Sequence, residues 1–139
     1  MKLKVKLDLD AKMPEYAHPF DGGMDLFANE RKVIHPESWG VVDTGVHVAI
    51  PKNYVGLITS KSGLMAKNGI TCRGTIDHGY TGSIKAVLYN HSKDRIIIEK
   101  GAKVTQMVIV PCEHFPFELV DDLKETERGD GGFGSTGVF

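Results

Sequence analysis

Residues 40–50 read GVVDTGVHVAI, and this stretch carries the clearest fold signal in the chain. Its valines and isoleucine recur at every second position, which is the spacing of a strand with one buried face. Similar apolar or β-branched runs occupy residues 2–9, 54–59, 83–90, 95–98 and 104–110. The chain is therefore expected to consist mainly of strands.

Proline or glycine interrupts these runs about every ten residues, a spacing typical of an all-β sandwich or barrel. At 139 residues the chain suits a single domain with a real core. One short helix is expected over residues 63–68, with Ser62 as its N-cap. The glycine-rich end of the chain, residues 128–139, is expected to form a flexible arm outside a domain of residues 1–127.

Composition excludes several functional classes. The formal net charge of −1 argues against a nucleic-acid-binding protein that depends on a broad basic face. No apolar run approaches the ~18 residues of a membrane span, and no signal peptide is expected. Cys72 and Cys112 lie far apart without a CxxC partner, which favours reduced thiols in the cytoplasm. The six histidines are scattered, so no metal site is assigned to them.

The last twelve residues, RGDGGFGSTGVF, have the composition of a clamp for a phosphate-bearing ligand. Glycines let backbone N–H groups approach a ligand closely. Arg128 can pair with phosphate oxygens, Ser135 and Thr136 can donate hydrogen bonds, and Phe133 offers a stacking face.

Three other interpretations fit parts of this arm. Gly129 and Gly134 have P-loop spacing, but the lysine is missing and no room remains for the helix that a P-loop opens. A disordered tail is the common fate of glycine-rich termini. The tripeptide Arg128-Gly129-Asp130 matches an adhesion motif, although matches of three residues are mostly chance.

Four internal segments place polar residues at turns, where scaffolds usually display function. They are GGMDL at 22–26, SKSGL at 60–64, GTIDHGYTG at 74–82, and Gln106 within residues 103–110. Each has an ordinary structural explanation when taken alone, such as an Asx-turn at Asp25 or a hairpin turn at Asp77.

In this order, and together with the arm, these segments resemble the five motifs of the trimeric deoxyuridine triphosphatases. GGMDLFA resembles the first motif and SKSGLMAK the second, while GTIDHGYTGSIKAVLYNHS resembles the third and KVTQMVIVP the fourth. RGDGGFGSTG is close to the fifth motif. The third and fifth are the most specific.

The resemblance implies a β-clip or jelly-roll-like barrel that forms a homotrimer, with each active site built from three chains. Such a ring is a closed head-to-tail interface. The implied reaction is hydrolysis of dUTP to dUMP and pyrophosphate, which limits uracil incorporation into DNA and supplies dUMP for dTMP synthesis.

The resemblance also implies residue roles. Asp77 would activate the water that attacks the α-phosphorus, and Tyr80 would pack under the deoxyribose. The remaining substrate-binding residues would be Lys61, Ser62, Gly63, Gly74, Ile76, Gln106, Arg128, Phe133, Gly134, Ser135 and Thr136. Mg²⁺ would be held by the substrate phosphates and water rather than directly by protein ligands, with Asp25 acting at most through a water.

Two positions depart from the family pattern. Lys61 replaces an arginine, and lysine lacks the bidentate fork. Gly79 replaces an acid, as in the related dCTP deaminases, but residues 85–89 lack the glutamate that a deaminase needs. A dCTP deaminase and a non-catalytic module that senses nucleotides or binds proteins remain the alternative functions.

Overall fold

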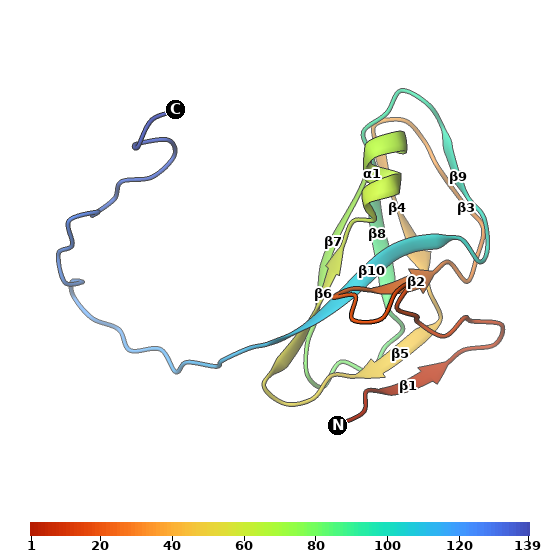
Figure 1. The fold of residues 1–139 in the computed structure, drawn as a ribbon, viewed down its shortest axis with the longest axis horizontal. Helices are drawn as coiled ribbons and strands as arrows, with labels where there is room; N and C mark the ends of the chain where they lie inside the picture. The colour runs from red at the N-terminus through yellow and green to blue at the C-terminus, as the bar shows by residue number, and fades with distance from the viewer.

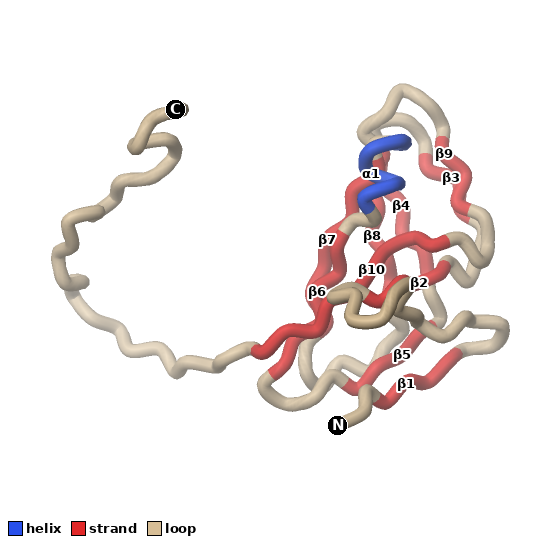
Figure 2. Tube along the Cα trace, viewed as in Figure 1, coloured by secondary structure: helices blue, strands red, loops and turns tan.

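The computed structural model describes residues 1–139 as a curled β structure with one helix and a long C-terminal extension (Figure 1). The elements in chain order are β1 Lys4–Leu7, β2 Met24–Phe27, β3 Lys32–Ile34, β4 Ser38–Asp43, β5 Val46–Ala49, β6 Tyr54–Thr59, α1 Ser62–Asn68, β7 Ile70–Ile76, β8 Lys85–Asn90, β9 Ile96–Ile98 and β10 Lys103–Pro111. The predicted all-β class is confirmed, and Figure 2 shows how little of the chain is helical.

Six strands form one sheet in the order β2-β10-β6-β7-β8-β4, and the pairs β1-β5 and β3-β9 form two small sheets. Every strand pairing is antiparallel. The core lies between these layers and is built from aliphatic side chains that include Leu26, Val42, Val46, Ile58, Ile70, Ile84, Leu88 and Met107. The seven-residue helix α1 is too short to span a membrane.

The predicted run at residues 40–50 is two strands rather than one. β4 ends at Asp43 and β5 begins at Val46, in a different sheet. The chain turns between them at Gly45, whose φ of 65° is a left-handed conformation that favours glycine. The alternation continues across the turn because Val42 and Val46 both face the core.

Three strands were not predicted from the sequence: β2, β3 and β7. All four residues of β2 are buried, so the polar–apolar alternation that marks a half-buried strand is absent. β3 has only three residues, and β7 contains Gly74 within the segment expected to be a turn. Tertiary pairing therefore overrides weak local patterns at these positions.

The predicted helix exists, but its expected cap is wrong. Ser62 is the first helical residue, and Lys61 occupies the N-cap position with an extended backbone and no side-chain hydrogen bond. A capping side chain must project from the non-helical residue before the helix, so Ser62 is one position too late. The helix ends at Gly69, which has a φ of 63° and donates its N–H to Met65 O.

Asn90, fully buried at the end of β8, connects three separate segments. Its amide nitrogen lies within hydrogen-bond distance of the carbonyl oxygens of Ile34, His35 and Asp94, at 2.8–3.2 Å. Its amide oxygen accepts bonds from the backbone N–H and the hydroxyl of Ser92. One side chain thus joins the β3–β4 connection to the β8–β9 turn.

The chain beyond β10 leaves the domain and ends far from the sheets (Figure 1). The Cys112 N–H donates to Asn53 O at 2.8 Å, next to the domain. Residues 112–139 contain no helix or strand, and Phe115, Phe117 and Leu119 are exposed along this extension. The extended conformation therefore begins well before Arg128.

Candidate active site

Strand pairing brings three of the predicted segments together. Gln106 on β10 is the register partner of Asp25 on β2 and of Thr59 on β6. The Gln106 side-chain amide donates to Ser60 O at 3.2 Å. A Cβ added at Gly23 would lie 2.7 Å from Gln106 Oε1, so glycine at that position leaves room for this side chain.

The predicted residues Asp25, Lys61 and Gln106 form a first group. Asp25 lies at its centre, and only 3 % of the Asp25 surface is exposed. Lys61 pairs with Oδ1, and Lys103 Nζ lies 2.8 Å from Oδ2. Burial by itself would raise the pKa of Asp25, but the hydrogen bonds and charges of Lys103 and Lys61 outweigh burial and lower it. Contact with Asp25 in turn raises the pKa of Lys103.

Ser62 and Gly63 lie next to Lys61 in the first turn of α1, and both are exposed. The first N–H groups of a helix have no partner within the helix. No atom outside its own neighbours lies within 4 Å of a Cβ built at Gly63, so this turn is open to solvent. The group Lys61, Ser62 and Gly63 therefore presents a cation, a hydroxyl and backbone donors on one accessible turn.

A second group of predicted residues lies on β7 and on the loop that follows it. Gly74 pairs with Ile58 and Ile76 with Gly56 in the sheet. Beside Gly74 is a cavity of about 310 Å³, lined by residues 57–59 and 73–75. Asp77 is exposed at the end of β7, where the loop begins.

Tyr80 in this loop is held by its own neighbours. Its N–H donates to Asp77 O at 3.1 Å, and its hydroxyl donates to Ser83 O at 3.0 Å. A Cβ at Gly82 would lie 2.5 Å from the Tyr80 hydroxyl oxygen, so the ring occupies space that only glycine leaves free. The ring is still 44 % exposed.

The two groups do not meet within one chain. Ile76 is paired with Gly56, and Lys61 lies five residues further along. At about 3.3 Å per strand residue, this places Lys61 and the start of the Asp77 loop roughly 16 Å apart. In Figure 1, α1 lies at one end of β7, and the chain continues into the loop after β7 at the other end.

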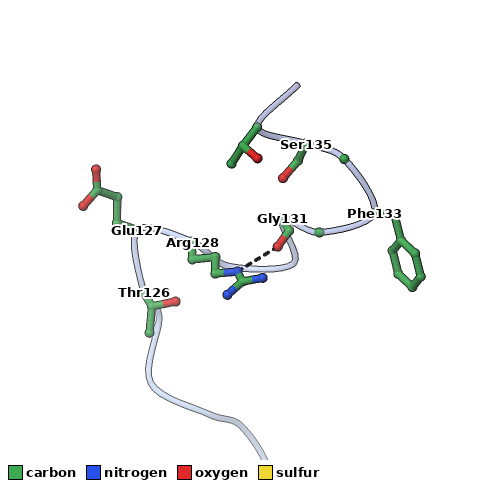
Figure 3. Close-up of a pocket in the computed structure, with 9 residues that line it drawn as sticks. Thr126, Glu127, Arg128, Gly131, Phe133 and Ser135 are labelled. Atoms are coloured by element: carbon green, nitrogen blue, oxygen red, sulfur yellow. Dashed lines mark hydrogen bonds between the residues drawn. The ribbon is translucent and has the colours of Figure 1, made fainter. Parts of the chain in front are cut away.

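The arm forms a third group and lies away from the sheets that carry the other two (Figure 1), and Figure 3 shows its side chains. Arg128 turns inward and donates from Nε to Gly131 O at 2.9 Å, whereas Phe133 points outward. Successive tight turns, such as Gly131 N–H to Arg128 O and Ser135 N–H to Gly132 O, curl the segment around an open hollow of about 870 Å³. Phe133 and Gly134 both have positive φ angles, 51° and 87°.

Sequence reasoning missed Lys103. It stands three residues before Gln106, so strict alternation puts the two side chains on opposite faces of β10. The pairing of β10 with β2 shifts register between Lys103 and Thr105, and such a bulge re-aims side chains. No signal in the sequence marks this bulge.

Sequence reasoning also missed the residues that fix the loop between β7 and β8. Asp43 accepts a short hydrogen bond from Ser83, and Thr44 donates to Ile84 O at 2.7 Å. Burial would raise the pKa of Asp43, but the Ser83 hydroxyl and the Gly45 N–H outweigh burial and lower it. The turn within residues 40–50 thus anchors the Asp77 loop.

The family model described as dUTPase matches residues 10–137, which include all three groups. The chain belongs to the dUTPase family. This membership confirms the resemblance drawn from the five motifs.

Individual dUTPases are similar over almost the whole chain. The deoxyuridine 5'-triphosphate nucleotidohydrolase of Clostridium tetani is 48 % identical, with 97 % of this chain and 96 % of the relative covered. The Clostridium kluyveri protein of the same name is 44 % identical, with both chains fully covered.

A solved structure, a mutant of the Staphylococcus bacteriophage 80alpha dUTPase with dUpNHpp, superposes with a TM-score of 0.92 at 34 % identity and covers 99 % of both chains. A second, a mutant of the dUTPase from phage phi11 of S. aureus, has a TM-score of 0.84 at 31 % identity and covers 90 % of this chain and 100 % of that one. Its description names a structural Mg(II) ion in that protein.

Proposed function

We propose how this chain carries out the activity of its family, the hydrolysis of dUTP to dUMP and pyrophosphate. Asp77, exposed at the start of its loop, accepts a proton from a water that attacks the α-phosphorus. A carboxylate is a weak base for water. Positioning and neutralisation of the phosphates must therefore supply most of the acceleration.

The other roles follow the geometry of the groups. The phosphate oxygens are bound by Lys61, Ser62, Gly63 and Gln106, since these residues lie together around the start of α1. Tyr80 packs against the deoxyribose and leaves no room for a 2′-hydroxyl. The backbone of β7 at Gly74 and Ile76 pairs with uracil, beside the 310 Å³ cavity. A site built for such hydrogen bonds rejects cytosine because mismatched polar groups stay unpaired.

The observation that carries this proposal is the strand register: Ile76 pairs with Gly56, so the strand rise puts the Lys61 turn roughly 16 Å from the Asp77 loop. One chain alone does not bring its phosphate-binding and water-activating groups together. A homotrimer does so if the first group of one subunit faces the second group of its neighbour. The exposed Phe115, Phe117 and Leu119 of the extension support this arrangement, because apolar side chains need a surface that covers them.

The arm closes over the site of a neighbouring subunit. The phosphates are bound by the side chains of Arg128, Ser135 and Thr136 and by the N–H groups of Gly134 and its neighbours. Phe133 stacks on uracil. Arg128 is engaged with Gly131 O in the open arm, so phosphate replaces an existing contact on closure. Closing costs about 1–2 kcal/mol per ordered residue. Several charge-assisted bonds of about 1.5–3 kcal/mol each are needed to offset it.

Mg²⁺ fits this site as an ion carried by the substrate. No group of three or more His, Cys, Asp or Glu side chains is arranged to hold a metal. Both oxygens of Asp25 face ammonium groups, so a direct bond from Asp25 to a cation would require displacing a lysine. Mg²⁺ commonly binds through substrate phosphates and keeps several waters, and it neutralises the charge that develops on them.

Substrate selectivity tests the activity directly. The protein is incubated with dUTP, dCTP, dTTP or UTP and Mg²⁺, and pyrophosphate and ammonia are assayed. We expect pyrophosphate from dUTP alone and no ammonia. Ammonia from dCTP would identify a deaminase, although β8, which reads KAVLYN, supplies no acid for that chemistry.

A variant tests the role of Asp77. Asp77→Asn should abolish pyrophosphate release while a non-hydrolysable dUTP analogue still binds. If the unmodified protein binds nucleotide and never releases pyrophosphate, it is a binding module instead.

Two unpaired cysteines support a cytoplasmic location for this activity.

A further inference from the structure

The imidazole of His47, on β5, lies between two hydrogen-bond acceptors. Its Nδ1 is 2.8 Å from the carbonyl oxygen of Thr81, in the loop that carries Asp77 and Tyr80. Its Nε2 is 3.0 Å from Oδ1 of Asp8, just beyond β1. The side chain is 19 % exposed, so it is held in the crevice between these segments.

Neither partner can donate a proton to the ring. A carbonyl oxygen only accepts, and an ionised carboxylate only accepts. A neutral imidazole has one N–H and one lone pair, so it satisfies one partner and opposes the other. Only the imidazolium, with N–H groups on both nitrogens, satisfies Thr81 and Asp8 together.

The charged groups around His47 are of both signs. Lys6 is its register partner on β1, and Asp8 lies at the end of that strand. The charge of Asp43 also interacts with that of His47. The hydrogen bond to Thr81 is the largest influence that raises the pKa of His47, the Asp8 contact adds to it, and burial and Lys6 lower it.

We propose that His47 is a positioning residue whose protonated ring ties the Asp77 loop to the β1–β5 sheet. The proposal rests on the proposed function, because that function makes this loop the carrier of Asp77 and Tyr80. The other loop anchors are Ser83 to Asp43 and His78 Nδ1 to Ile50 O at 2.7 Å. Both contacts of His47 require the doubly protonated ring, and this ring loses a proton as the pH rises above the pKa of His47.

The direction of the pH effect follows from the contacts. Protonated His47 holds Thr81 at pH values below the raised pKa of His47. As pH rises through the pKa of His47 in the folded protein, one N–H is lost and the ring can no longer serve both acceptors. The loop should then open more often, and turnover should fall without any change in the phosphate-binding residues.

Amide exchange in the nucleotide-free protein tests this without depending on catalysis. Protection factors, which correct for intrinsic pH dependence, are measured for the amides of Tyr80 and Ile84, whose bonds lie within and at the end of the loop. We expect protection to fall about 3- to 10-fold as His47 deprotonates, the effect of one hydrogen bond. The Gly101 amide, bonded to Ala28 O at 2.7 Å, is the control outside the loop.

Three variants separate the two nitrogens. His47→Asn places an amide nitrogen near the position of Nδ1 and should keep loop protection at every pH. His47→Gln places one near Nε2 and should lose loop protection at every pH. Asp8→Asn can donate to Nε2, so a neutral ring can keep its N–H on Thr81 and the pH dependence should disappear.

Kinetics supply the second measurement. For dUTP hydrolysis, the fall of kcat/KM on the basic side should become shallower in His47→Asn and Asp8→Asn, while His47→Gln is about 3- to 10-fold lower throughout. Equal loop protection in the Asn and Gln variants, or none lost as His47 titrates, would overturn the proposal. Absence of dUTP hydrolysis in the unmodified protein would overturn the proposed function instead, and the exchange data would still decide the role of His47.

Discussion

Lys103 Nζ lies 2.8 Å from the buried Oδ2 of Asp25, and the other oxygen of that carboxylate pairs with Lys61. One acid therefore fixes two lysines next to the phosphate-binding turn proposed above. This relationship makes Asp25 an organiser of positive charge, so changes at Asp25 should act through the lysines.

Asp25→Asn should lower stability by about 1–2 kcal/mol, because the lysines are partly exposed and can turn to solvent once unpaired. The pKa of Asp25 is lowered in the folded protein, so its contribution is present above the unfolded value of 3.8 and lost as pH falls through the folded pKa. Urea unfolding from pH 7 down to pH 2 should show the two proteins converging at acid pH. A constant difference would contradict this account.

Lys61→Arg should keep or improve turnover. The guanidinium can still pair with Asp25, and it adds the planar fork that binds phosphate oxygens in pairs. Steady-state kinetics with dUTP measure the effect, and Lys67→Arg on the same helix is the matched control. A large loss of kcat would show that Lys61 occupies a pocket that accepts only lysine.

Gly82→Ala should displace the Tyr80 ring, since the new Cβ would lie 2.5 Å from its hydroxyl oxygen. The ring end can swing toward solvent, so stability should change little. Discrimination between dUTP and UTP should fall about 10-fold, the scale of one well-placed packing contact. Gly22→Ala, which meets nothing within 4 Å and lies outside the arm, is the control for adding a methyl group. Unchanged discrimination would mean that Tyr80 does not sense the sugar.

Asn90→Ala should be among the most damaging substitutions in the domain. It leaves the carbonyls of the β3–β4 connection and the donors of Ser92 without their partner. Stranded buried polar groups cost about 1–3 kcal/mol each, so a loss of about 3 kcal/mol is expected in chemical denaturation. Asn68→Ala, at the exposed end of α1, should cost far less.

The arm should be cut by protease more slowly when nucleotide is bound. Arg128 and its neighbours are exposed in the free protein, and closure over a neighbouring subunit would shield them. Limited trypsin digestion with and without a non-hydrolysable dUTP analogue measures this. Equal cleavage rates at Arg128 would contradict closure, and Lys2 near the other terminus is an internal reference that should not change.

The candidate site residues could be proposed from the sequence because they sit in compact segments with distinctive chemistry. The glycines beside Arg128 and Phe133 mark the arm as a candidate phosphate-binding segment. The segment at Asp77 has a specific order of residues. The failures have a common physical origin. The position of Lys103 depends on a bulge in β10. The break at Gly45 depends on a left-handed backbone torsion, and β2 is hard to recognise because all of its residues are buried.

Local patterns in the sequence were enough to predict the all-β class and the family, and to nominate the candidate site residues. These are local properties, because alternation reports one buried face and a motif reports its own side chains. The tertiary structure alone decided that Asp25 holds two lysines, that His47 holds Thr81, and that Asp77 lies far from Lys61 in its own chain. Contacts between residues distant in sequence depend on strand order and register, and no local pattern encodes them.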